Sequence, residues 1–372
     1  MKFKISSEEL KKIVSISSRV CGINLTLPVL NNILLTLENG NLQFFSTNLE
    51  IGILITIPVD SKEKGKISIP GKIFSEFVNS LPKQDVEINT DNFIVNLKCG
   101  DYNAKILGQD PKDFPVLPEI KEKTITNIKS KDLISGFSKV SNIVSPLDTR
   151  TEISGILVNF KKDKLIICGT DSIRLAEKTI NLSGRIKDLS VIIPQKTTIE
   201  IGYIFSEYEG NVGVIVDKSQ ISFDFNPKNK KDPQISIVSR LIEGSFPEYK
   251  EIIPKKIKTE SIFKKDDLYN KIKIAGLFSS KIQDIKLKFH PKSSKLSILA
   301  SSSNIGESQS QLKGKIKGEE MEVNLNWKYF LDGLSIMNSS EVLVGVNDAT
   351  SPIIIRPVGD NTYFYILMPK TV

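Results

Sequence analysis

The chain has 372 residues, of which 40% are hydrophobic and 25% charged, and its formal net charge is +8. This composition is that of an ordinary folded protein of two or three domains, and the basic balance permits a polyanionic partner without requiring one. Three widely separated cysteines argue against a disulfide framework or a zinc site. The lack of a long apolar run or a signal-peptide core predicts a cytoplasmic protein with no membrane partner.

A strand followed by a helix is predicted three times along the chain. Residues 3–6 alternate in the manner of a strand, and Leu10, Ile13 and Val14 follow at helical spacing, with Ser6 or Ser7 available as the N-cap. The pattern returns at 125–140 and at 261–275. A two-stranded hairpin is expected after each occurrence, at 33–44, 155–168 and 285–299, and the turn of the first is the Asn-Gly pair at 39–40.

A second landmark, in which a strand runs directly into a helix, also occurs three times. It covers residues 67–74, 191–198 and 323–330, and it places Lys72, Lys196 and Lys328 at the same step of the helix start. Another hairpin is expected after each helix, at 86–97, 212–225 and 342–355.

The two landmarks predict three repeats of one unit, with limits at 1–122, 123–255 and 256–372. Each unit contains two helices and several alternating strands. The sequence therefore predicts an α+β fold of antiparallel sheets, in which one face is wet and helices cover the other.

Groups that carry catalysis are scarce in this sequence. His290 is the only histidine, it lies in a predicted turn, and no P-loop, dinucleotide-binding or nucleophile-elbow motif is present. Carboxylate pairs such as Glu8-Glu9 and Asp266-Asp267 are expected in first helical turns, where they favour the helix dipole. We expect no catalytic residue, no metal and no cofactor, although a carboxylate-dependent hydrolase remains an open alternative.

Lysine and arginine side chains on the predicted helices are candidates for contact with duplex DNA. Such a duplex carries one negative charge per ~1.7 Å of axis, so dispersed basic groups can hold it without reading bases. Basic and acidic residues balance in the first repeat, so the contact depends on where the charges lie rather than on net charge. The candidates are Lys11, Lys12, Arg19, Lys72, Lys131, Lys139, Lys196, Lys271, Lys273 and Lys328.

Several short phrases carry a resemblance that covers the full chain. They are MKF at 1–3, TLPVL at 26–30, TNLE at 47–50, GTDSIRLA at 169–176, EGSFPEY at 243–249 and LMP at 367–369. In this order and spacing they resemble the bacterial DNA polymerase III beta subunit family, the DNA sliding clamps.

The resemblance implies three tandem copies of the DNA-clamp fold, closed into a ring as a head-to-tail homodimer around double-stranded DNA. It implies a non-catalytic clamp that confers processivity on the replicative polymerase. The implied partners are the DNA polymerase III alpha subunit, the clamp loader, and other proteins with clamp-binding motifs, such as repair polymerases. A relative that acts as a monomeric binding module for repair polymerases is the alternative within the family.

Family site residues are carried over by position. The resemblance implies a dimer interface that includes Tyr102, Ala104 and Leu277. Departures from the family pattern at Glu251, Lys370 and Asn24, and an additional polar loop at 226–233, leave the peptide preference and one DNA contact open. The implied partner-peptide pocket, between the second and third repeats, uses Ile153, Thr170, Arg174, Leu175, Pro247, Ile252, Ser351, Ile366 and Met368.

Overall fold

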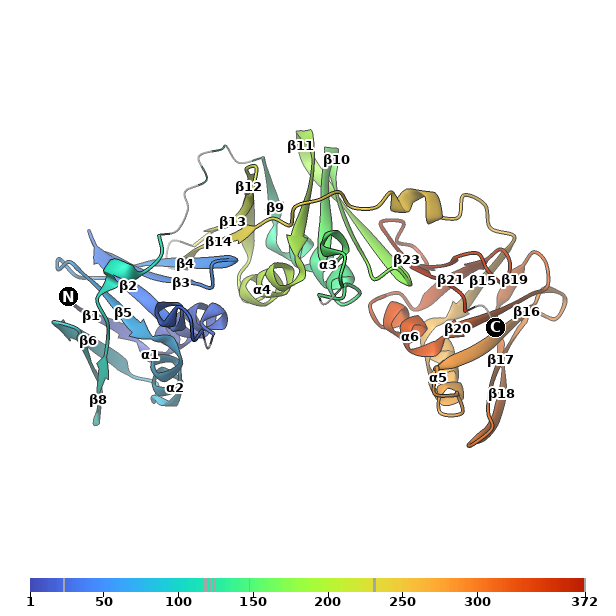
Figure 1. Cartoon of the computed structure of the whole chain (residues 1–372), viewed down its shortest axis with the longest axis horizontal. Coiled ribbons are helices and arrows are strands. Elements are labelled where there is room, and N and C mark those ends of the chain that lie inside the picture. The colour runs from blue at the N-terminus through green and yellow to red at the C-terminus, as the bar shows by residue number, and fades with distance from the viewer. Residues whose placement is uncertain are drawn as a thin grey trace. The chain divides into compact units, whose positions relative to one another are not determined.

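The chain folds into two compact units, each built from parts distant in sequence. The computed structural model describes residues 1–370 except 23, 117–119, 121, 123, 124, 147, 230 and 231. One unit contains residues 1–135 and 196–242, and the other contains 136–195 and 243–372 (Figure 1). The second predicted repeat is thus divided between the two units.

The first unit contains two antiparallel sheets. The larger has eight strands, in the order β5 (Gly65–Pro70), β2 (Asn32–Glu38), β3 (Asn41–Thr47), β4 (Ile51–Pro58), β14 (Gln234–Arg240), β13 (Gln220–Pro227), β12 (Gly210–Val216) and β9 (Thr126–Lys129). The smaller has the order β1 (Lys2–Ser6), β6 (Asp85–Asp91), β7 (Ile94–Cys99) and β8 (Tyr102–Leu107). Helices α1 (Ser7–Ser17), α2 (Gly71–Ser80) and α4 (Gln195–Phe205) accompany these sheets.

The second unit is organised in the same way. Its seven-stranded sheet has the order β10 (Gly155–Thr170), β11 (Arg174–Pro194), β23 (Tyr363–Leu367), β22 (Ile353–Pro357), β21 (Glu341–Val346), β15 (Thr259–Lys264) and β19 (Lys315–Lys317). A four-stranded sheet has the order β18 (Gly306–Lys313), β17 (Lys295–Ser302), β16 (Asp284–His290) and β20 (Met321–Asn326). Helices α5 (Lys265–Gly276) and α6 (Trp327–Ser335) belong to this unit, and α3 (Ser130–Ser141) enters it from the first.

Both landmark helices of each repeat begin where the sequence predicts. The Ser6 side chain caps α1 by accepting a hydrogen bond from the backbone N–H of Glu9 at 3.2 Å. The Asn39-Gly40 turn has φ values of 51° and 75°, which suit asparagine and glycine. The predicted turn of the middle hairpin lies inside β10, where the register with β11 shifts on both sides of Lys162 and φ of Lys162 is 45°. The helix starts and the first hairpin are therefore confirmed, whereas the hairpin predicted at 155–168 is a single strand that pairs with β11.

The apolar stripes of the helices form the core with the inner faces of the sheets. Leu10, Ile13 and Val14 of α1 are all buried, as are Phe74 and Val78 of α2. Complete burial of a side chain of this size contributes about 1.5–3 kcal/mol. These two helices are therefore fixed mainly by packing, and none of their charged residues is buried.

Neighbouring repeats share sheets, which the sequence pattern does not reveal. Strand β4 of the first repeat pairs with β14 of the second, placing Gly52 opposite Val238. Strand β11 of the second repeat pairs with β23 of the third, placing Leu175 opposite Ile366. These two junctions carry continuous hydrogen-bonded ladders, and they therefore hold the ends of successive repeats in fixed register.

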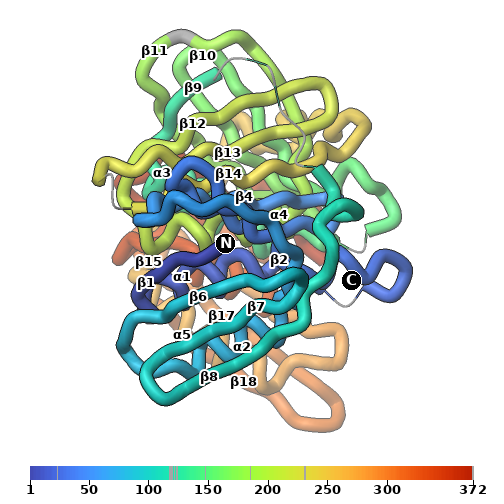
Figure 2. The backbone as a smooth tube through the Cα atoms, turned by 90° about the vertical axis from the view of Figure 1, so that its left-hand side faces the viewer, coloured from blue at the N-terminus to red at the C-terminus, as the bar shows by residue number. Residues whose placement is uncertain are grey.

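Each four-stranded sheet ends in a strand with an unpaired edge. Strand β8 is outermost in the first unit, next to β7 (Figure 2), and β18 is outermost in the second. Tyr102 on β8 is 56% exposed, and Leu107 at its other end is also exposed. A free edge with apolar side chains can accept another strand.

None of the described helices is long and apolar enough to cross a membrane.

Candidate functional site

The junction of β11 and β23 is built on a tight turn that precedes β11. The Thr170 hydroxyl donates to the backbone carbonyl of Arg174 at 2.8 Å and accepts from the N–H of Ser172 at 3.0 Å. Asp171 Oδ1 accepts from the N–H groups of Ile173 and Arg174. Ser172 has φ of 72°, a left-handed conformation that these bonds stabilise. The turn therefore fixes the position from which the Arg174 side chain leaves β11.

The guanidinium of Arg174 is held on three sides. Its Nε donates to Asp171 at 2.9 Å, its terminal nitrogen donates to Asp332 at 2.5 Å, and its Cζ lies 4.3 Å from the ring centroid of Tyr329. The Arg174 side chain is 11% exposed, whereas Asp332 is 54% exposed. The arginine is consequently rigid and orders the side chains of α6 beside the β11–β23 ladder.

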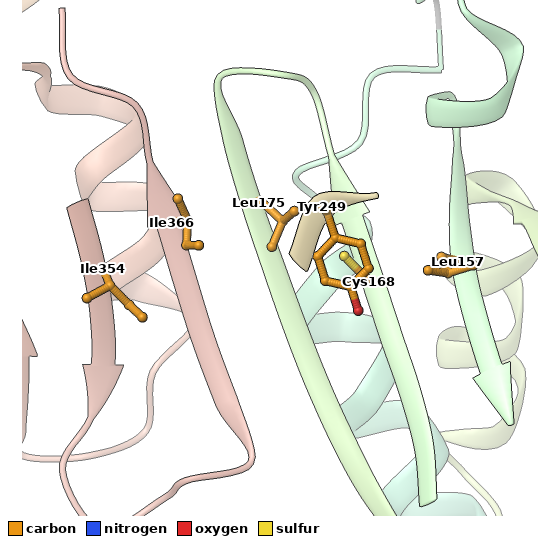
Figure 3. Packing of buried hydrophobic residues seen from close by; sticks show 6 residues of the cluster. All are labelled: Leu157, Cys168, Leu175, Tyr249, Ile354 and Ile366. Atoms are coloured by element: carbon orange, nitrogen blue, oxygen red, sulfur yellow. The ribbon is translucent and has the colours of Figure 1, made fainter. Parts of the chain in front are cut away.

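Behind this ladder lies a continuous apolar cluster, whose members Figure 3 labels. Leu175 and Ile366 face each other across the paired strands, and Cys168 and Tyr249 lie beside Leu175. Phe246 and Ile253, which flank Tyr249 in sequence, are partly buried and pack against the same cluster. The cluster consists of Leu157, Cys168, Leu175, Tyr249, Ile354 and Ile366.

One carboxylate lies at the margin of this cluster. The Tyr249 hydroxyl donates to Glu177 at 2.5 Å. Burial raises the pKa of Glu177, while the bond from Tyr249 opposes that rise. Burial also raises the pKa values of Tyr249 and of the Cys168 thiol, which therefore stay protonated at neutral pH. These groups hold Tyr249 in place and supply no reactive nucleophile.

The structure brings most of the expected pocket residues to this junction. Met368 continues from β23, and its N–H donates to the Ile173 carbonyl at 2.8 Å. Ser351 is held by Asp348 after a tight turn that leads into β22. Pro247 and Ile252 flank Tyr249 and are exposed. Ile153 is buried, in the short helical turn before β10.

The departures from the family pattern have local explanations. Asn24 Oδ1 accepts hydrogen bonds from the N–H groups of Thr26 and Leu27, so this side chain orders its own loop. Lys370 donates its ammonium group to the Ile282 carbonyl, and Glu251 is exposed. The 226–233 loop lies partly outside the described residues.

Most of the expected DNA-facing side chains lie on helix surfaces. Lys72, Lys196 and Lys328 are exposed in the first turns of α2, α4 and α6. Lys12 and Lys273 are exposed, and Lys271 is half-buried. Lys11 donates to the Leu81 carbonyl at 2.5 Å, and Lys131 pairs with Glu209 at 2.5 Å.

Two further candidates, Arg19 and Lys139, also have partners within the protein. Arg19 pairs with the buried carboxylate of Glu200 and lies 3.7 Å from the ring centroid of Tyr203. Lys139, whose side chain is 13% exposed, pairs with Asp360 at 3.7 Å and lies over Tyr363. Burial and the neighbouring Lys178 lower the pKa of Lys139. Both cations already have partners distant in sequence, and their contact with DNA stays a prediction.

Sequence reasoning missed Tyr329 and Asp332, which lie on α6 and hold Arg174. Neither follows a motif, and their contact with a residue more than 150 positions away depends on tertiary structure. Of the expected interface residues, Tyr102 on β8 and Leu277 directly after α5 are exposed, and Ala104 on β8 is half-buried. Among the described residues, no cluster of histidine, cysteine and acidic side chains could hold a metal ion. His290 lies 2.6 Å from Glu320 and 3.1 Å from Ser297.

Comparison with known proteins gives consistent matches along the chain. Models of the DNA polymerase III beta subunit match in order: the N-terminal domain over residues 1–118, the central domain over 127–248 and the C-terminal domain over 250–371. The beta sliding clamp of Bacillus subtilis is 26% identical over 99% of both chains, and that of Staphylococcus aureus is 25% identical over 92% of both.

Solved structures agree with these matches. The DNA polymerase sliding clamp from Bacillus subtilis has a TM-score of 0.92 at 26% identity, covering 100% of this chain and 99% of that one. The fold is also that of a Pseudomonas aeruginosa sliding clamp bound to griselimycin, with a TM-score of 0.92 at 23% identity over 100% of both chains. Three consecutive domain matches of one family, over a fold that this family shares along its full length, establish that the chain belongs to the DNA polymerase III beta subunit family, the beta sliding clamps.

Proposed function

We propose that the chain forms a head-to-tail homodimeric ring around double-stranded DNA and docks its partners in the β11–β23 pocket. Sliding clamps of DNA polymerase III are non-catalytic processivity factors, and the chain is one of them. The specific partners that we propose are the polymerase III alpha subunit, the clamp loader and repair polymerases. We expect it to act in the cytoplasm, where bacterial DNA lies.

The observation that carries the ring proposal is the pair of unlike open edges. A head-to-tail ring requires two different surfaces on one chain that fit each other, and it closes when the rotation from one subunit to the next returns to the first. Strands β8 and β18 are edge strands of two different sheets. Exposed Tyr102 lies on β8, and exposed Leu277 and Ile274 lie at the end of α5, which packs against β18. Backbone pairing of the two edges would satisfy their free hydrogen-bonding groups.

The pocket proposal rests on the chemistry of the β11–β23 junction. A short peptide with large apolar side chains needs a concave apolar surface with few polar groups at its rim. Leu175, Ile366 and Tyr249 supply the apolar floor, and the fixed guanidinium of Arg174 supplies a polar boundary. Because Arg174 is already held by two carboxylates, it positions a ligand more than it attracts one.

Retention on circular DNA tests the ring directly. We expect the clamp, loaded by its clamp loader onto a nicked circular plasmid, to co-elute with the DNA during gel filtration. Linearisation of the plasmid should release it, because a topological link is lost at free ends. Equal retention on both forms at matched salt would contradict the ring and indicate ordinary DNA binding. A one-chain mass by light scattering, without retention on either form, would favour the monomeric binding module.

An acidic substitution tests the pocket separately from the ring. Ile252 is 42% exposed, so Ile252→Glu should leave the fold intact while placing an unpaired carboxylate where an apolar peptide side chain docks. We expect the affinity for the polymerase to fall by roughly 10–100-fold, since desolvating an unpaired charge opposes docking. Surface plasmon resonance with immobilised polymerase measures this.

Val358→Glu is the matched control, because Val358 is similarly exposed in the same unit and lies outside the pocket. Both variants should remain on nicked circular DNA. Unchanged polymerase affinity of Ile252→Glu would show that partners dock elsewhere.

A further inference from the structure

The junction of β4 and β14, in the first unit, has the same backbone frame as the β11–β23 pocket. The Thr47 hydroxyl donates to the Ile51 carbonyl at 2.9 Å and accepts from the N–H of Leu49 at 3.0 Å. Asn48 Oδ1 accepts from the N–H groups of Glu50 and Ile51. Leu49 has φ of 73°, and Ser172 in the other turn has 72°. The two turns therefore present their following strands in the same way.

The strands that follow these turns also pair in the same register. Gly52 lies opposite Val238, as Leu175 lies opposite Ile366. The Arg240 N–H donates to the Glu50 carbonyl at 2.9 Å, and the Met368 N–H makes the corresponding bond at the other junction. Arg240 thus occupies, in the first unit, the backbone position that Met368 occupies in the pocket.

A Phe-Pro segment closes both junctions. Phe246-Pro247 precedes Tyr249 in the pocket, and Phe114-Pro115 occupies the corresponding place in the first unit. Phe114 packs edge-to-face on Phe45, with ring centroids 5.6 Å apart. The segment then continues to Val116, which lines the junction with Pro115.

A cleft remains open at this first junction. Its floor contains Phe45, Gly52 and Val238, and its rim contains Leu49 and Val116. Leu49 is 43% exposed and Val116 is 88% exposed. Large aliphatic side chains that border a cleft and remain this exposed lose contact with water when an apolar group is inserted.

Three polar groups around the cleft define what it would accept. The buried Oε1 of Gln220 finds no hydrogen-bond donor among the described residues, so a ligand N–H would satisfy it. Arg240 and Glu50 both line the cleft and are exposed. A ligand carboxylate would pair with Arg240, and the presence of Glu50 limits the ligand to a small net negative charge.

We propose that this β4–β14 cleft is a second docking site for an extended segment of a partner protein. The segment carries one large apolar side chain for the space between Leu49 and Val116, and an acidic side chain for Arg240. Its backbone N–H bonds to Gln220. The two clefts differ in specificity. The buried Ile51 occupies in the first unit the position that Arg174 has in the pocket, and the cation of the first cleft is instead Arg240 on the paired strand β14. The choice of a peptide ligand rests on the proposed function of the pocket.

Methyl NMR of the full-length clamp can follow the two clefts separately. The reporters are the labelled methyl groups of Leu49 and Val116 for the first junction and of Leu175 for the pocket. The probe is acetyl-Ala-Leu-Phe-Asp-amide, and the same peptide with Lys in place of Asp is the charge control. We expect saturable shifts at Leu49 and Val116 with the acidic probe, and weaker binding there of the Lys probe.

Charge reversal identifies the contact. Arg240→Glu should weaken binding of the acidic probe at Leu49 and Val116 by about tenfold while leaving its titration at Leu175 unchanged. Lys98→Glu is the matched control, since Lys98 is an exposed cation elsewhere in the same unit and should change neither titration. Shifts confined to Leu175, or first-junction shifts that Arg240→Glu does not weaken, would overturn the second site. Shifts at Leu49 without shifts at Leu175 would contradict the proposed pocket instead.

Discussion

Replacing Leu277 with aspartate is expected to convert the proposed ring into monomers that a nicked circular plasmid does not retain. Leu277 follows α5 and is 67% exposed, and the neighbouring Ile274 is 55% exposed. Exposed apolar side chains beside a free sheet edge are suited to burial against a second chain. Aspartate at this position is compatible with the isolated chain, because its carboxylate stays in water.

In the ring the same carboxylate would be buried without a partner. An unpaired buried charge costs about 3–5 kcal/mol, which corresponds to a weakening of each interface by roughly 100–4000-fold. Light scattering at micromolar concentration measures the mass, and gel filtration with nicked plasmid measures retention. Val358→Asp is the control, since Val358 is exposed on a different segment of the same unit. If the Leu277→Asp clamp stays dimeric, Leu277 is not part of the interface.

The second large effect is expected from reversing three equivalent lysines. Lys72, Lys196 and Lys328 are each exposed in the first turn of the second helix of a repeat. If all three contact phosphates, their replacement by glutamate removes three contacts per subunit and adds repulsion. The slope of log affinity against log salt should then fall by about five for the ring, since each phosphate contact contributes roughly 0.9.

Duplex binding of the ring over a series of salt concentrations measures this slope, and loading onto nicked plasmid should fall in parallel. A control ring with Lys62, Lys98 and Lys317 replaced by glutamate has the same net charge, and these exposed lysines do not lie on helices. Equal slopes for the two triple variants would mean that net charge, and not its placement on the helices, governs the contact. Loading and retention of the helix variant at the unsubstituted level would exclude the three lysines from the DNA surface.

The sequence by itself determined the order and the type of the elements. Strand alternation, helical spacing and turn residues are local properties, and they correctly placed the six helices named above and hairpins such as β2–β3 and β16–β17. The order of the phrase at 169–176 is also local, because the turn of Thr170 and Asp171 is held by hydrogen bonds from these two side chains to the backbone of the same turn.

Only the tertiary structure decided how these elements combine. The repeats share sheets through β4–β14 and β11–β23, so the compact units cut the chain differently from the repeats. Arg19 and Lys139 appear in sequence as solvated helix cations, yet Glu200 and Asp360 neutralise them. Periodicity indicates which face of an element is apolar, but not which distant strand or charge will meet it. That choice depends on the packing of the whole chain. The same packing forms the cleft beside the Thr47 turn.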